Sequence, residues 1–486
     1  MNILFAASEA FPYAKSGGLA DIMHSLPKSL AEADHKVSVV IPYYPQIMGE
    51  LCGKLKVRYD QFDVQLGDTL ERTRIHEDRI NKNLTYYFVE YNRFYDRPKL
   101  YDWAGEEYAD NAERYIFLCR ATMDLAIALN LDLDILHTND WHTSLCNVYL
   151  KSNIYSDNAT FAKCKSVITI HNIGYQGIFD KANLYWTGLG WEYFNHTCLE
   201  YNDCLNFLNA GILTADMVST VSPTYAKEIL TPEFAFNLEG SLGHVAARNK
   251  LKGIINCIDT YEWNSEIDPL IPANYTLKSL AGKKKCKKAL QKQFGLPQKA
   301  KTPVFGIVSR LATQKGIDVF CDAIWSMLEE DDCQFVILGS GEQWLHDRLD
   351  FLAKSFPKKI GVYIGYDNKL AHMIEAGVDM FVMPSRYEPC GLNQMYSMRY
   401  GTVPVVRATG GLEDTVENYD PNTVDSSTGF KFNLLTVDAL LNTLRWAEAI
   451  YATRPDHFSK IMANGMKQDF SAKHMAKEYE QMYLEI

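Results

Sequence analysis

The stretch ILFAASEAFPYAKSGGLADIMHSLPKSLAEADHKVSVVI, residues 3–41, decides the fold class of this chain. It opens with an apolar run at 3–7 that is typical of a buried strand, and it continues through a turn rich in proline and glycine. Further apolar residues then recur at intervals of four, four and three, which predicts a helix with one apolar face. An apolar run at 37–41 predicts the next strand. The helix residues are Ile22, Leu26, Leu30 and Ala33.

The same alternation of strand and helix continues along the chain. Short runs rich in β-branched residues occur at 134–137, 167–171 and 217–221. The pattern begins again near residue 303, with candidate strands at 304–309, 334–338, 362–364, 380–383 and 403–406. We therefore predict an α/β protein with two doubly wound, parallel-sheet domains, residues 1–258 and 259–465. A linker is predicted at 261–272, where two prolines interrupt a stretch of weak periodicity.

Composition and charge exclude several classes of protein. Of the 486 residues, 47% are hydrophobic and 22% are charged, which excludes a mainly disordered chain. The net charge of −11 lacks the positive field of a duplex-DNA binder, so we expect no nucleic-acid partner. No run of 18 apolar residues occurs, so we expect no membrane span. Eleven cysteines without a CxxC pair, and a start without a signal-peptide pattern, predict a cytoplasmic location, or a plastid if a transit peptide has been removed.

Two Gly-Gly loops stand where strands lead into helices. The segment Ser16–Asp21 reads SGGLAD, and Thr409–Asp414 repeats it as TGGLED. In an open α/β sheet, ligands bind at the carboxyl ends of strands, and glycines next to a helix N-terminus suit a phosphate. Lys15 adds a positive charge to the first loop. A tight turn with a surface lysine explains the same residues, and the local sequence favours neither interpretation.

A basic loop follows the first candidate strand of the second half. Arg310 and Lys315 lie within six residues of the strand end, and two cations there suit a diphosphate. A solvated basic loop is the alternative. The usual nucleotide motifs are absent, because Gly339-Ser340-Gly341 is not completed to GxGxxG and no GxxxxGK[ST] occurs. Simple NAD binding and P-loop ATPase chemistry are therefore disfavoured.

Three further strand ends carry polar residues. Glu388 lies in the segment PSRYEPCGL at 384–392, where it is placed either to cap a helix or to bind a polar ligand. In the same segment, Cys390 is expected to be a packed side chain rather than a nucleophile. The segment HTNDWH at 137–142 matches no standard metal spacing, so we expect no metal site and interpret Asp140 as a ligand-binding carboxylate. His171 follows another strand in the same way. It is interpreted either as a ligand-binding residue or as a buried histidine with a structural role.

Taken together, these segments resemble the bacterial glycogen synthases and plant-type starch synthases, which are retaining glycosyltransferases with the GT-B fold. The resemblance covers essentially the whole chain and rests on many short motifs in a fixed order. They are KSGGL at 15–19, NDWH at 139–142, TIHN at 169–172, YQG at 175–177, VSPTYA at 221–226, GIIN at 253–256, SRL at 309–311, QKG at 314–316, EPCGL at 388–392 and TGGL at 409–412.

The resemblance implies two Rossmann-like domains that face a deep cleft, with a C-terminal helix at about 466–486 that crosses back to the N-terminal domain. Met475, Tyr479, Met482 and Ile486 recur at helical spacing and agree with such a helix. It also implies transfer of glucose from ADP-glucose to the nonreducing end of an α-1,4-glucan, with retention of configuration. The implied partners are a nucleotide sugar and an α-glucan such as glycogen, starch or a maltooligosaccharide, and no cofactor or metal is implied. It leaves the oligomeric state open.

The resemblance also implies a role for individual residues. The catalytic set comprises Arg310, Lys315, Glu388, His171 and Asp140. The nucleotide-sugar-binding set comprises Lys15, Gly17, Gly18, Asn256, Tyr366, Cys390, Gly391, Leu392, Thr409, Gly410, Gly411 and Leu412. Asp21, Tyr95 and Asn172 are expected to contact the acceptor or the sugar. Among these, Arg310 and Lys315 are expected to neutralise the departing diphosphate, Tyr366 to stack on adenine, and the amides near Gly391, Gly411 and Leu412 to hold the distal phosphate and sugar.

One departure and three alternatives remain. Cys257 stands where the family usually has glycine, which puts the local loop geometry in doubt, because a positive φ is harder for cysteine. The donor is either ADP-glucose or UDP-glucose, since stacking on Tyr366 tolerates any base. A non-catalytic glucan-binding protein is the other reading of the function, although Lys15, Arg310, Lys315 and Glu388 are intact. Front-face substitution is favoured over double displacement, because the sequence places no nucleophilic carboxylate on the other sugar face.

Overall fold

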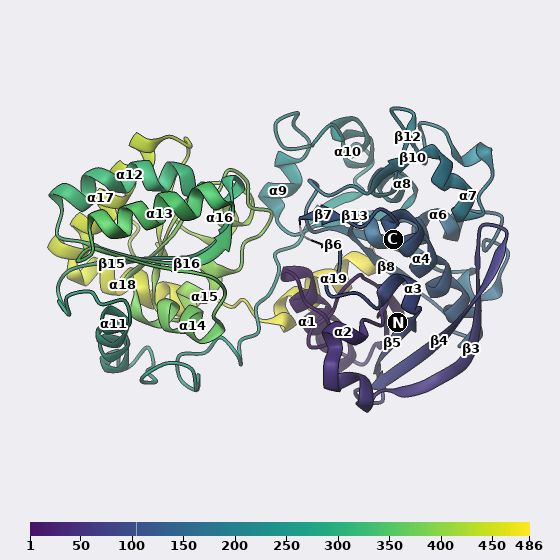
Figure 1. The fold of residues 1–486 in the computed structure, drawn as a ribbon, viewed down its shortest axis with the longest axis horizontal. Coiled ribbons are helices and arrows are strands. Elements are labelled where there is room, and N and C mark those ends of the chain that lie inside the picture. The colour runs from purple at the N-terminus through teal and green to yellow at the C-terminus, as the bar shows by residue number, and fades with distance from the viewer. Residues whose placement is uncertain (104) are drawn as a thin grey trace. The chain divides into compact units, whose positions relative to one another are not determined.

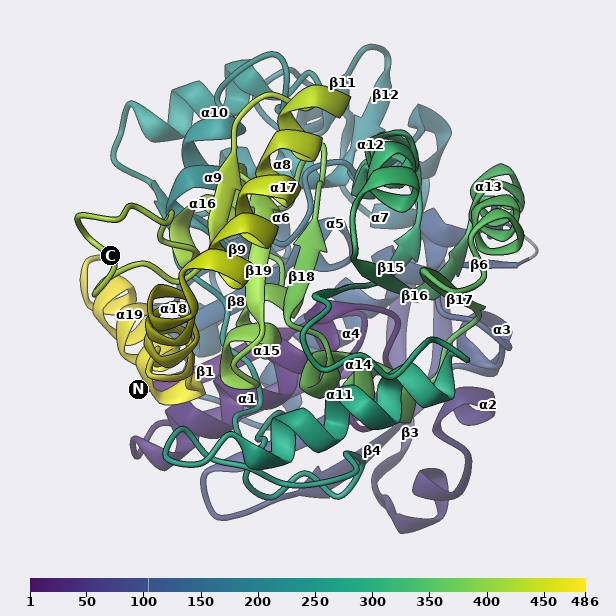
Figure 2. The same ribbon diagram turned by 90° about the vertical axis from the view of Figure 1, so that its left-hand side faces the viewer.

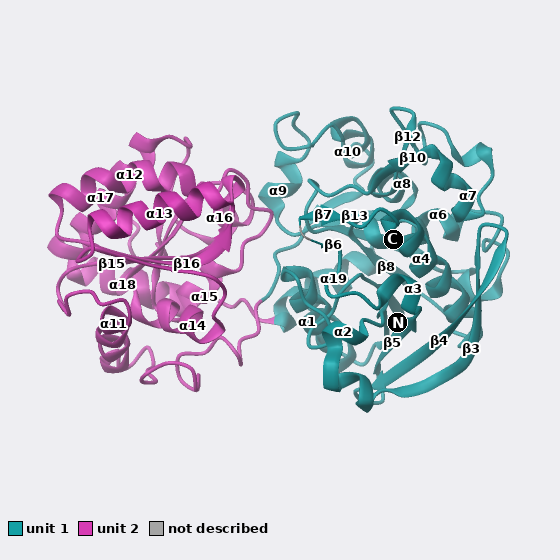
Figure 3. Ribbon diagram, viewed as in Figure 1, with its two compact units in different colours: residues 1–257, 472–486 teal, residues 258–471 magenta. Residues whose placement is uncertain are grey.

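The computed structural model describes residues 1–103 and 105–486, and these form two compact units (Figure 3). Unit 1 comprises residues 1–257 together with 472–486, and unit 2 comprises residues 258–471. The chain therefore passes between the units at 257/258 and again at 471/472, next to the domain boundary predicted at 258/259. No helix among the described residues is long and apolar enough to cross a membrane.

Unit 1 is built on a nine-stranded sheet of order β14-β13-β9-β8-β1-β2-β5-β4-β3, in which β13 is Met217–Thr220 and the edge strand β14 is Leu251–Gly253. The central strand β1 (Asn2–Ala6) lies between β2 (Lys36–Pro42) and β8 (Ile135–Asn139), and all three are parallel. Helices cover both faces of these strands, so nearly all of their residues beyond the first are buried. Burial on both sides explains why each strand appears in the sequence as a continuous apolar run.

One edge of this sheet corrects the prediction of an all-parallel sheet. β5 (Leu84–Glu90) is parallel to β2, but β4 (Thr69–Arg79) is antiparallel to β5, and β3 (Lys56–Leu66) is antiparallel to β4. A two-residue turn at 67–68 joins β3 to β4, and Gly67 has a φ of +56° there. The hairpin is rich in exposed charged side chains, as in the ion pair of Arg72 with Asp63, and this character hid its strands from a search for apolar runs.

The C-terminal helix α19 (Ala472–Leu484) belongs to unit 1 and lies beside α1 (Gly18–Glu32) in Figures 1 and 2. Polar contacts help to hold it to the unit. Tyr483 O–H lies 2.6 Å from Nδ1 of His137 in β8, and Glu480 lies 3.0 Å from Nε2 of His35. The predicted start near residue 466 is corrected, because residue 466 ends the preceding helix α18 (Pro455–Met466).

Unit 2 contains a six-stranded, fully parallel sheet of order β17-β16-β15-β18-β19-β20. Alternate residues of its central strands β15 (Val304–Leu311) and β16 (Gln334–Gly341) belong to two apolar clusters, one on each face of the sheet. Helices α12 (Ile317–Glu330), α13 (Gln343–Ser355) and α17 (Val437–Thr453) contribute to one cluster, and α11 (Ala281–Gln293) and α14 (Asn368–Gly377) to the other (Figure 1). The other strands are β17 (Ile360–Ile364), β18 (Met380–Met383), β19 (Val403–Arg407) and β20 (Phe430–Phe432).

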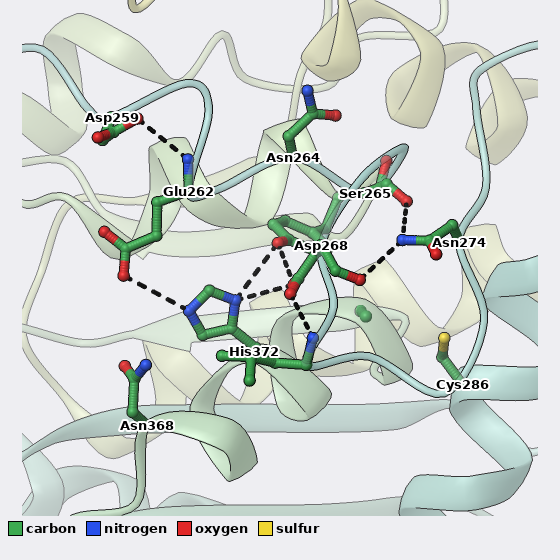
Figure 4. Close-up of polar contacts among 12 residues, drawn as sticks. Asp259, Glu262, Asn264, Ser265, Asp268, Asn274, Cys286, Asn368 and His372 are labelled. Carbon is green, nitrogen blue, oxygen red and sulfur yellow. Dashed lines mark hydrogen bonds and ion pairs between the residues drawn. The ribbon is translucent and has the colours of Figure 1, made fainter.

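The linker predicted at 261–272 is wrong, because this segment is packed into unit 2 (Figure 4). The ring of Trp263 stacks between His372 and Tyr396, with centroid distances of 3.9 Å to each. Asp268 is buried and accepts hydrogen bonds at Oδ2 from Nδ1 of His372 at 2.8 Å and from the hydroxyl of Tyr400 at 2.6 Å. Side-chain contacts of this kind leave no periodic signal in the sequence, so the segment resembled a linker.

The strand orders place a topological switch point in each unit. Counted along the chain, the parallel strands of unit 2 have the order 3-2-1-4-5-6, and those of unit 1 begin in the same way, so the order reverses between β15 and β18 and between β1 and β8. Ligands of open α/β sheets bind outside the carboxyl ends of strands at such a point. The two Gly-Gly loops are not equivalent, because one follows the first strand of its sheet and the other follows the fifth strand, β19.

Candidate functional site

The loop between β1 and α1 in unit 1 presents a lysine beside two carboxyl groups. Lys15 donates from Nζ to Oδ1 of Asp21 at 2.6 Å, and both side chains are partly exposed. Glu9 is buried and accepts a hydrogen bond at Oε2 from the backbone N–H of Ser16 at 2.5 Å. Burial raises the pKa of Glu9 to about 7, although the hydrogen bonds from Ser16 oppose this rise. The loop is thus anchored from the inside and carries an exposed cation.

The first glycine of this loop is not required by the packing of the protein. Gly17 has an extended backbone with φ of −155°, and a Cβ on it would meet nothing closer than Oε1 of Glu9, at 3.9 Å. Gly18 begins α1, and the first N–H groups of a helix have no partner within it. Open space next to such groups suits a phosphate. Phosphate binding by Lys15, Gly17 and Gly18 agrees with this geometry and stays a prediction.

Asp140 joins the ends of two neighbouring strands, β8 and β9 (Lys165–Ile170). Its Oδ1 accepts hydrogen bonds from the backbone N–H groups of His171 at 2.7 Å and of Asn172 at 3.4 Å. Burial raises its pKa to about 7, although these two donors oppose the rise. Asp140 also has a φ of +53°, which is uncommon for a residue other than glycine. Its carboxyl group therefore positions His171, and direct contact with a ligand stays a prediction.

His171 is held as a neutral imidazole of defined tautomer. Asn139 donates from Nδ2 to the carbonyl of Ala6 at 3.1 Å, so its Oδ1 is an acceptor and lies 2.9 Å from Nε2 of His171. Nε2 must therefore carry the proton, which leaves Nδ1 as a hydrogen-bond acceptor. Burial lowers the pKa of His171 to about 3, so the ring stays uncharged at neutral pH.

Two of the residues expected to contact sugar have structural partners. Asn172 accepts a hydrogen bond at Oδ1 from the N–H of Gly174 at 3.0 Å and so shapes the turn that follows β9. Tyr95, at the end of α3 (Asn92–Tyr95), is fully buried and donates its hydroxyl to the carbonyl of Arg114 at 2.7 Å. The structure thus places Tyr95 in the core of unit 1 rather than on a surface.

The segment of unit 1 that ends at residue 257, where the chain first passes to unit 2, contains a buried polar atom without a partner in the described part of the chain. Oδ1 of Asn256 is buried and has no hydrogen-bond partner among the described residues. Buried polar atoms are nearly always paired, so this one marks a place where a partner is missing. The neighbouring Cys257 is buried and is not one of the residues with positive φ. Cysteine is therefore accommodated at this position without backbone strain, which removes the doubt about loop geometry.

In unit 2 the two sides of the switch point are joined by an ion pair. Lys315, in the loop after β15, donates from Nζ to Oε2 of Glu388 at 2.6 Å, and Glu388 lies in the loop after β18. The same oxygen accepts a hydrogen bond from the hydroxyl of Ser385 at 3.0 Å. Glu388 is only 6% exposed. The structure thus brings together two of the predicted catalytic residues.

Arg310 is the more exposed of the two predicted cations. It stands near the end of β15, and its guanidinium group donates to Oε1 of Gln314 at 3.3 Å. Gln314 in turn donates from Nε2 to the carbonyl of Tyr387 at 3.4 Å. Arg310 and Lys315 therefore both belong to the carboxyl end of β15, which is the edge of the sheet that the switch-point rule selects.

Close backbone contacts hold the loops of this edge together. Gly316 has a φ of +68°, and a Cβ on it would lie 1.9 Å from the carbonyl oxygen of Pro384. A Cβ on Gly410, whose φ is +45°, would lie 2.0 Å from the carbonyl oxygen of Glu388. Only glycine fits at both positions, because any side chain would collide with backbone. These glycines serve the packing of the loops and, through it, the position of Glu388.

The predicted phosphate-binding amides are partly engaged within the protein. The N–H of Gly411 lies 3.2 Å from the carbonyl oxygens of both Glu388 and Pro389, and the N–H of Leu412 donates to Thr409 at 3.1 Å. These two N–H groups are therefore paired within the protein, and phosphate binding by the amides near Gly391, Gly411 and Leu412 stays a prediction. The N–H of Gly411 attaches α16 (Gly410–Thr415) to the loop that carries Glu388, whereas the N–H of Leu412 bonds within the first turn of α16.

The remaining predicted residues lie at the same edge. Cys390 is buried, which agrees with a packed side chain. Gly391 has a φ of +72°, and Leu392 precedes α15 (Asn393–Arg399). Tyr366 lies two residues beyond the end of β17 and is 80% exposed, with its hydroxyl 3.3 Å from Oδ1 of Asn368. An exposed ring at a strand end is a suitable surface for stacking a base.

Several residues that complete this geometry were not predicted to matter. Ser385 and Arg386 belong to the segment at 384–392, but the sequence predicted no role for either. Asp318 lies two residues after Gly316. Asn139 orients His171, and Glu342 follows the glycines whose nucleotide motif is incomplete. A polar residue next to a predicted site loop is the signal that would have selected them. They are positioning groups that contact other side chains or loop backbone, so their roles depend on how the loops pack together.

Comparison with known proteins places this arrangement in a family. A family model described as the starch synthase catalytic domain matches residues 2–244, and one described as glycosyl transferases group 1 matches residues 289–458. Glycogen synthase 1 of Geobacter metallireducens is 42% identical, over 99% of this chain and 95% of the relative. The glycogen synthase of Koribacter versatilis is 43% identical, over 99% of this chain and 98% of the relative.

The structural comparison agrees. The catalytic domain of starch synthase IV from Arabidopsis thaliana, bound to ADP and acarbose, superposes with a TM-score of 0.90 and 29% identity, and covers 100% of this chain and 99% of that one. Matches that span both units over their full length show the family and its architecture of two doubly wound domains. The chain therefore belongs to the glycogen and starch synthase family of glycosyltransferases and has the GT-B fold.

Proposed function

We propose that this protein transfers glucose from ADP-glucose to the nonreducing end of an α-1,4-glucan, with retention of configuration, without a metal ion, and with ADP as the leaving group. The observation that carries this proposal is the group of Arg310, Lys315 and Glu388 at the switch point of unit 2. Two cations and one carboxylate at this edge suit a diphosphate joined to a sugar. The Arabidopsis relative is bound to ADP and acarbose, which supports ADP as the nucleotide product and a saccharide as the acceptor.

The cations act on the leaving group. Cleavage of the bond between the anomeric carbon and the diphosphate oxygen leaves an oxocarbenium-like sugar and a new negative charge on ADP. Arg310 is exposed and able to pair with two phosphate oxygens, and Lys315 supplies a compact charge whose position is set by Glu388. Preorganised cations stabilise the charge that develops on the leaving group in the transition state, and this lowers the activation free energy.

Glu388 acts on the sugar. Its Oε2 is occupied by Lys315 and Ser385, so Oε1 is the atom that we propose accepts a hydrogen bond from a glucose hydroxyl. We also propose that His171 binds substrate through Nδ1 as a hydrogen-bond acceptor, since its low pKa keeps that nitrogen unprotonated at neutral pH. Lys15 and the backbone near Gly17 are proposed to contact the donor phosphates.

Retention is proposed to follow from front-face substitution. A double displacement needs a carboxylate that is available as a nucleophile. Among the predicted catalytic residues, Glu388 is paired with Lys315, and Asp140 accepts hydrogen bonds from two backbone N–H groups. Burial also raises the pKa of Asp140 to about 7, so that part of it is protonated, and therefore not nucleophilic, at neutral pH. The acceptor hydroxyl is then proposed to attack on the side from which ADP leaves and to transfer its proton to the departing phosphate.

The test is direct. Purified protein is incubated with glycogen and either ADP-[14C]glucose or UDP-[14C]glucose, in the presence of EDTA, and label in the precipitated polymer is counted. We expect label from ADP-glucose, an undiminished rate in EDTA, and release by enzymes that cleave α-1,4 linkages. Label from UDP-glucose alone would overturn the donor, and glycogen binding without release of nucleotide from either donor would overturn the activity.

A further inference from the structure

We propose that Glu342 is a positioning residue that holds the loop at 312–316 in shape and thereby sets the position of Lys315. This inference rests on the proposed function, because it takes Lys315 as a leaving-group stabiliser. Oε1 of Glu342 accepts a hydrogen bond from the backbone N–H of Thr313 at 2.9 Å, and Oε2 accepts one from the hydroxyl of Thr313 at 3.0 Å. The carboxylate therefore holds Thr313 at two points, two residues before Lys315.

Glu342 is itself fixed on the neighbouring strand end. Its backbone N–H donates to the carbonyl of Leu311 at 2.8 Å, and its Oε2 also accepts a hydrogen bond from the indole N–H of Trp344 at 2.7 Å. β15 and β16 are paired up to Leu311 and Gly341, so Glu342 stands directly beyond the paired strands. We call the two contacts of Glu342 with Thr313 the clamp. It is built on the end of a pair of hydrogen-bonded strands.

The opposite side of the loop is held by Arg386. Its guanidinium group donates to the carbonyl of Thr313 at 2.5 Å and to both carboxylate oxygens of Asp318, at 2.8 and 2.6 Å. The backbone N–H of Arg386 donates to the carbonyl of Gln314 at 2.8 Å. Both backbone polar groups of Thr313 are therefore taken, the N–H by Glu342 and the carbonyl by Arg386.

The loop needs this support because it is too short to hold itself. Thr313–Lys315 is a single 3-10 turn between a strand and a helix, and none of its side chains is buried. Without Glu342 the N–H and hydroxyl of Thr313 lose these partners, and Lys315 is held less firmly in the position in which it contacts Glu388. A displaced Lys315 lowers the rate of catalysis, because stabilisation of the leaving group depends on its distance from the cation.

The chemistry requires a carboxylate rather than an amide. In Glu342→Gln, the new NH2 group must face either the N–H of Thr313 or the indole N–H of Trp344, and two donors repel each other. The hydrogen bonds from Thr313 and Trp344 also lower the pKa of Glu342, so the side chain stays ionised at neutral pH. Glu342→Gln is therefore a test of the clamp that changes neither the size nor the shape of the residue.

A double-mutant cycle tests the inference. Glu342→Gln and Lys315→Ala are made singly and together, with Glu329→Gln, an exposed glutamate on α12, as the matched control. We expect Glu342→Gln alone to lower kcat about tenfold and to weaken ADP binding in calorimetry, with an unchanged thermal midpoint. In the Lys315→Ala background, where nothing remains to be positioned, we expect it to change kcat by less than about twofold.

The outcomes separate this inference from the proposed function. If Lys315→Ala is impaired but Glu342→Gln matches wild type, the clamp is refuted and the role of Lys315 stands. An equal loss of kcat from Glu342→Gln in both backgrounds shows that Glu342 acts elsewhere, and a loss that follows a fall in thermal midpoint shows a structural role only. If Lys315→Ala is fully active, the leaving-group role of Lys315 is refuted. The inference about Glu342 is then refuted as well, because it depends on that role.

Discussion

Nζ of Lys315 lies 2.6 Å from Oε2 of Glu388, although the two residues are 73 positions apart in the chain. The contact arises because β15 and β18 are neighbours in the sheet, so that the loops at their carboxyl ends meet. A cation that is already paired with a carboxylate has a defined position before any diphosphate binds. The energetic benefit is preorganisation, since the protein does not have to reorganise as charge develops on the leaving group.

Removal of either cation is expected to abolish most of the activity while the protein stays folded. Arg310→Ala and Lys315→Ala should each lower kcat by about 10²-fold or more, the typical cost of losing one stabilising group. Lys315→Ala should also be the less stable of the two, because it leaves the nearly buried Glu388 without its cation, whereas Arg310 is exposed.

These effects are measured as initial rates with ADP-glucose and glycogen, together with thermal unfolding. Lys284→Ala is the matched control, since Lys284 is exposed on α11. Wild-type rates in both Arg310→Ala and Lys315→Ala would contradict the assignment of the leaving-group stabilisers.

The raised pKa of Asp140 predicts a pH dependence of stability. In the folded protein its pKa is about 7, against an ordinary value of 3.8, so between these values the folded state binds the proton more tightly than the unfolded state does. This contribution to stability is fully present below about pH 4 and is lost as the pH rises through 7. A shift of this size corresponds to about 4 kcal/mol, as an upper estimate.

The measurement is the free energy of unfolding in urea at several pH values from 4 to 8, for wild type and Asp140→Asn. The asparagine variant should show a flatter profile over this range, because it cannot titrate. Asp60→Asn, in which an exposed carboxylate is neutralised, is the control and should follow wild type. Parallel profiles for wild type and Asp140→Asn would disprove a raised pKa.

The stacked ring of Trp263 predicts that this side chain contributes to the stability of unit 2. Trp263→Ala removes a side chain that packs between His372 and Tyr396 and should destabilise unit 2 by about 3 kcal/mol. Tyr261→Ala, two residues away and 79% exposed, should have almost no effect. Denaturant unfolding followed by hydrogen exchange assigns the loss to a unit. If the segment at 261–272 were a linker, the two variants would behave alike.

The exposed ring of Tyr366 predicts a contribution to donor binding rather than to chemistry. Stacking of a base on an aromatic ring contributes about 1–3 kcal/mol, so Tyr366→Ala should raise the KM for ADP-glucose about tenfold and leave kcat nearly unchanged. Tyr363→Ala, in which a half-exposed tyrosine of β17 is removed, is the control. A fall in kcat at unchanged KM would show that Tyr366 does not act as a base platform.

The sequence alone determined the elements whose signal is local. Strands β1, β2, β8, β15 and β16 are covered on both faces, so each appears as an apolar run. The loops after β1 and β15 were recognised as candidate sites from their glycines and cations. The hairpin of β3 and β4 was missed because its exposed strands carry charged residues instead of an apolar run. The family motifs then implied the reaction, because they preserve both residue type and order.

Only the tertiary structure decided which atoms meet. The contact between Lys315 and Glu388 depends on strand order, and the neutral tautomer of His171 depends on the amide of Asn139. Tyr95, a predicted contact residue, proved to be core, and the N–H of Gly411 proved to be bonded to a neighbouring loop. The physical reason is common to all four: periodicity is a property of neighbouring residues, whereas the partner of a buried polar atom is set by segments that are distant in sequence and packed together.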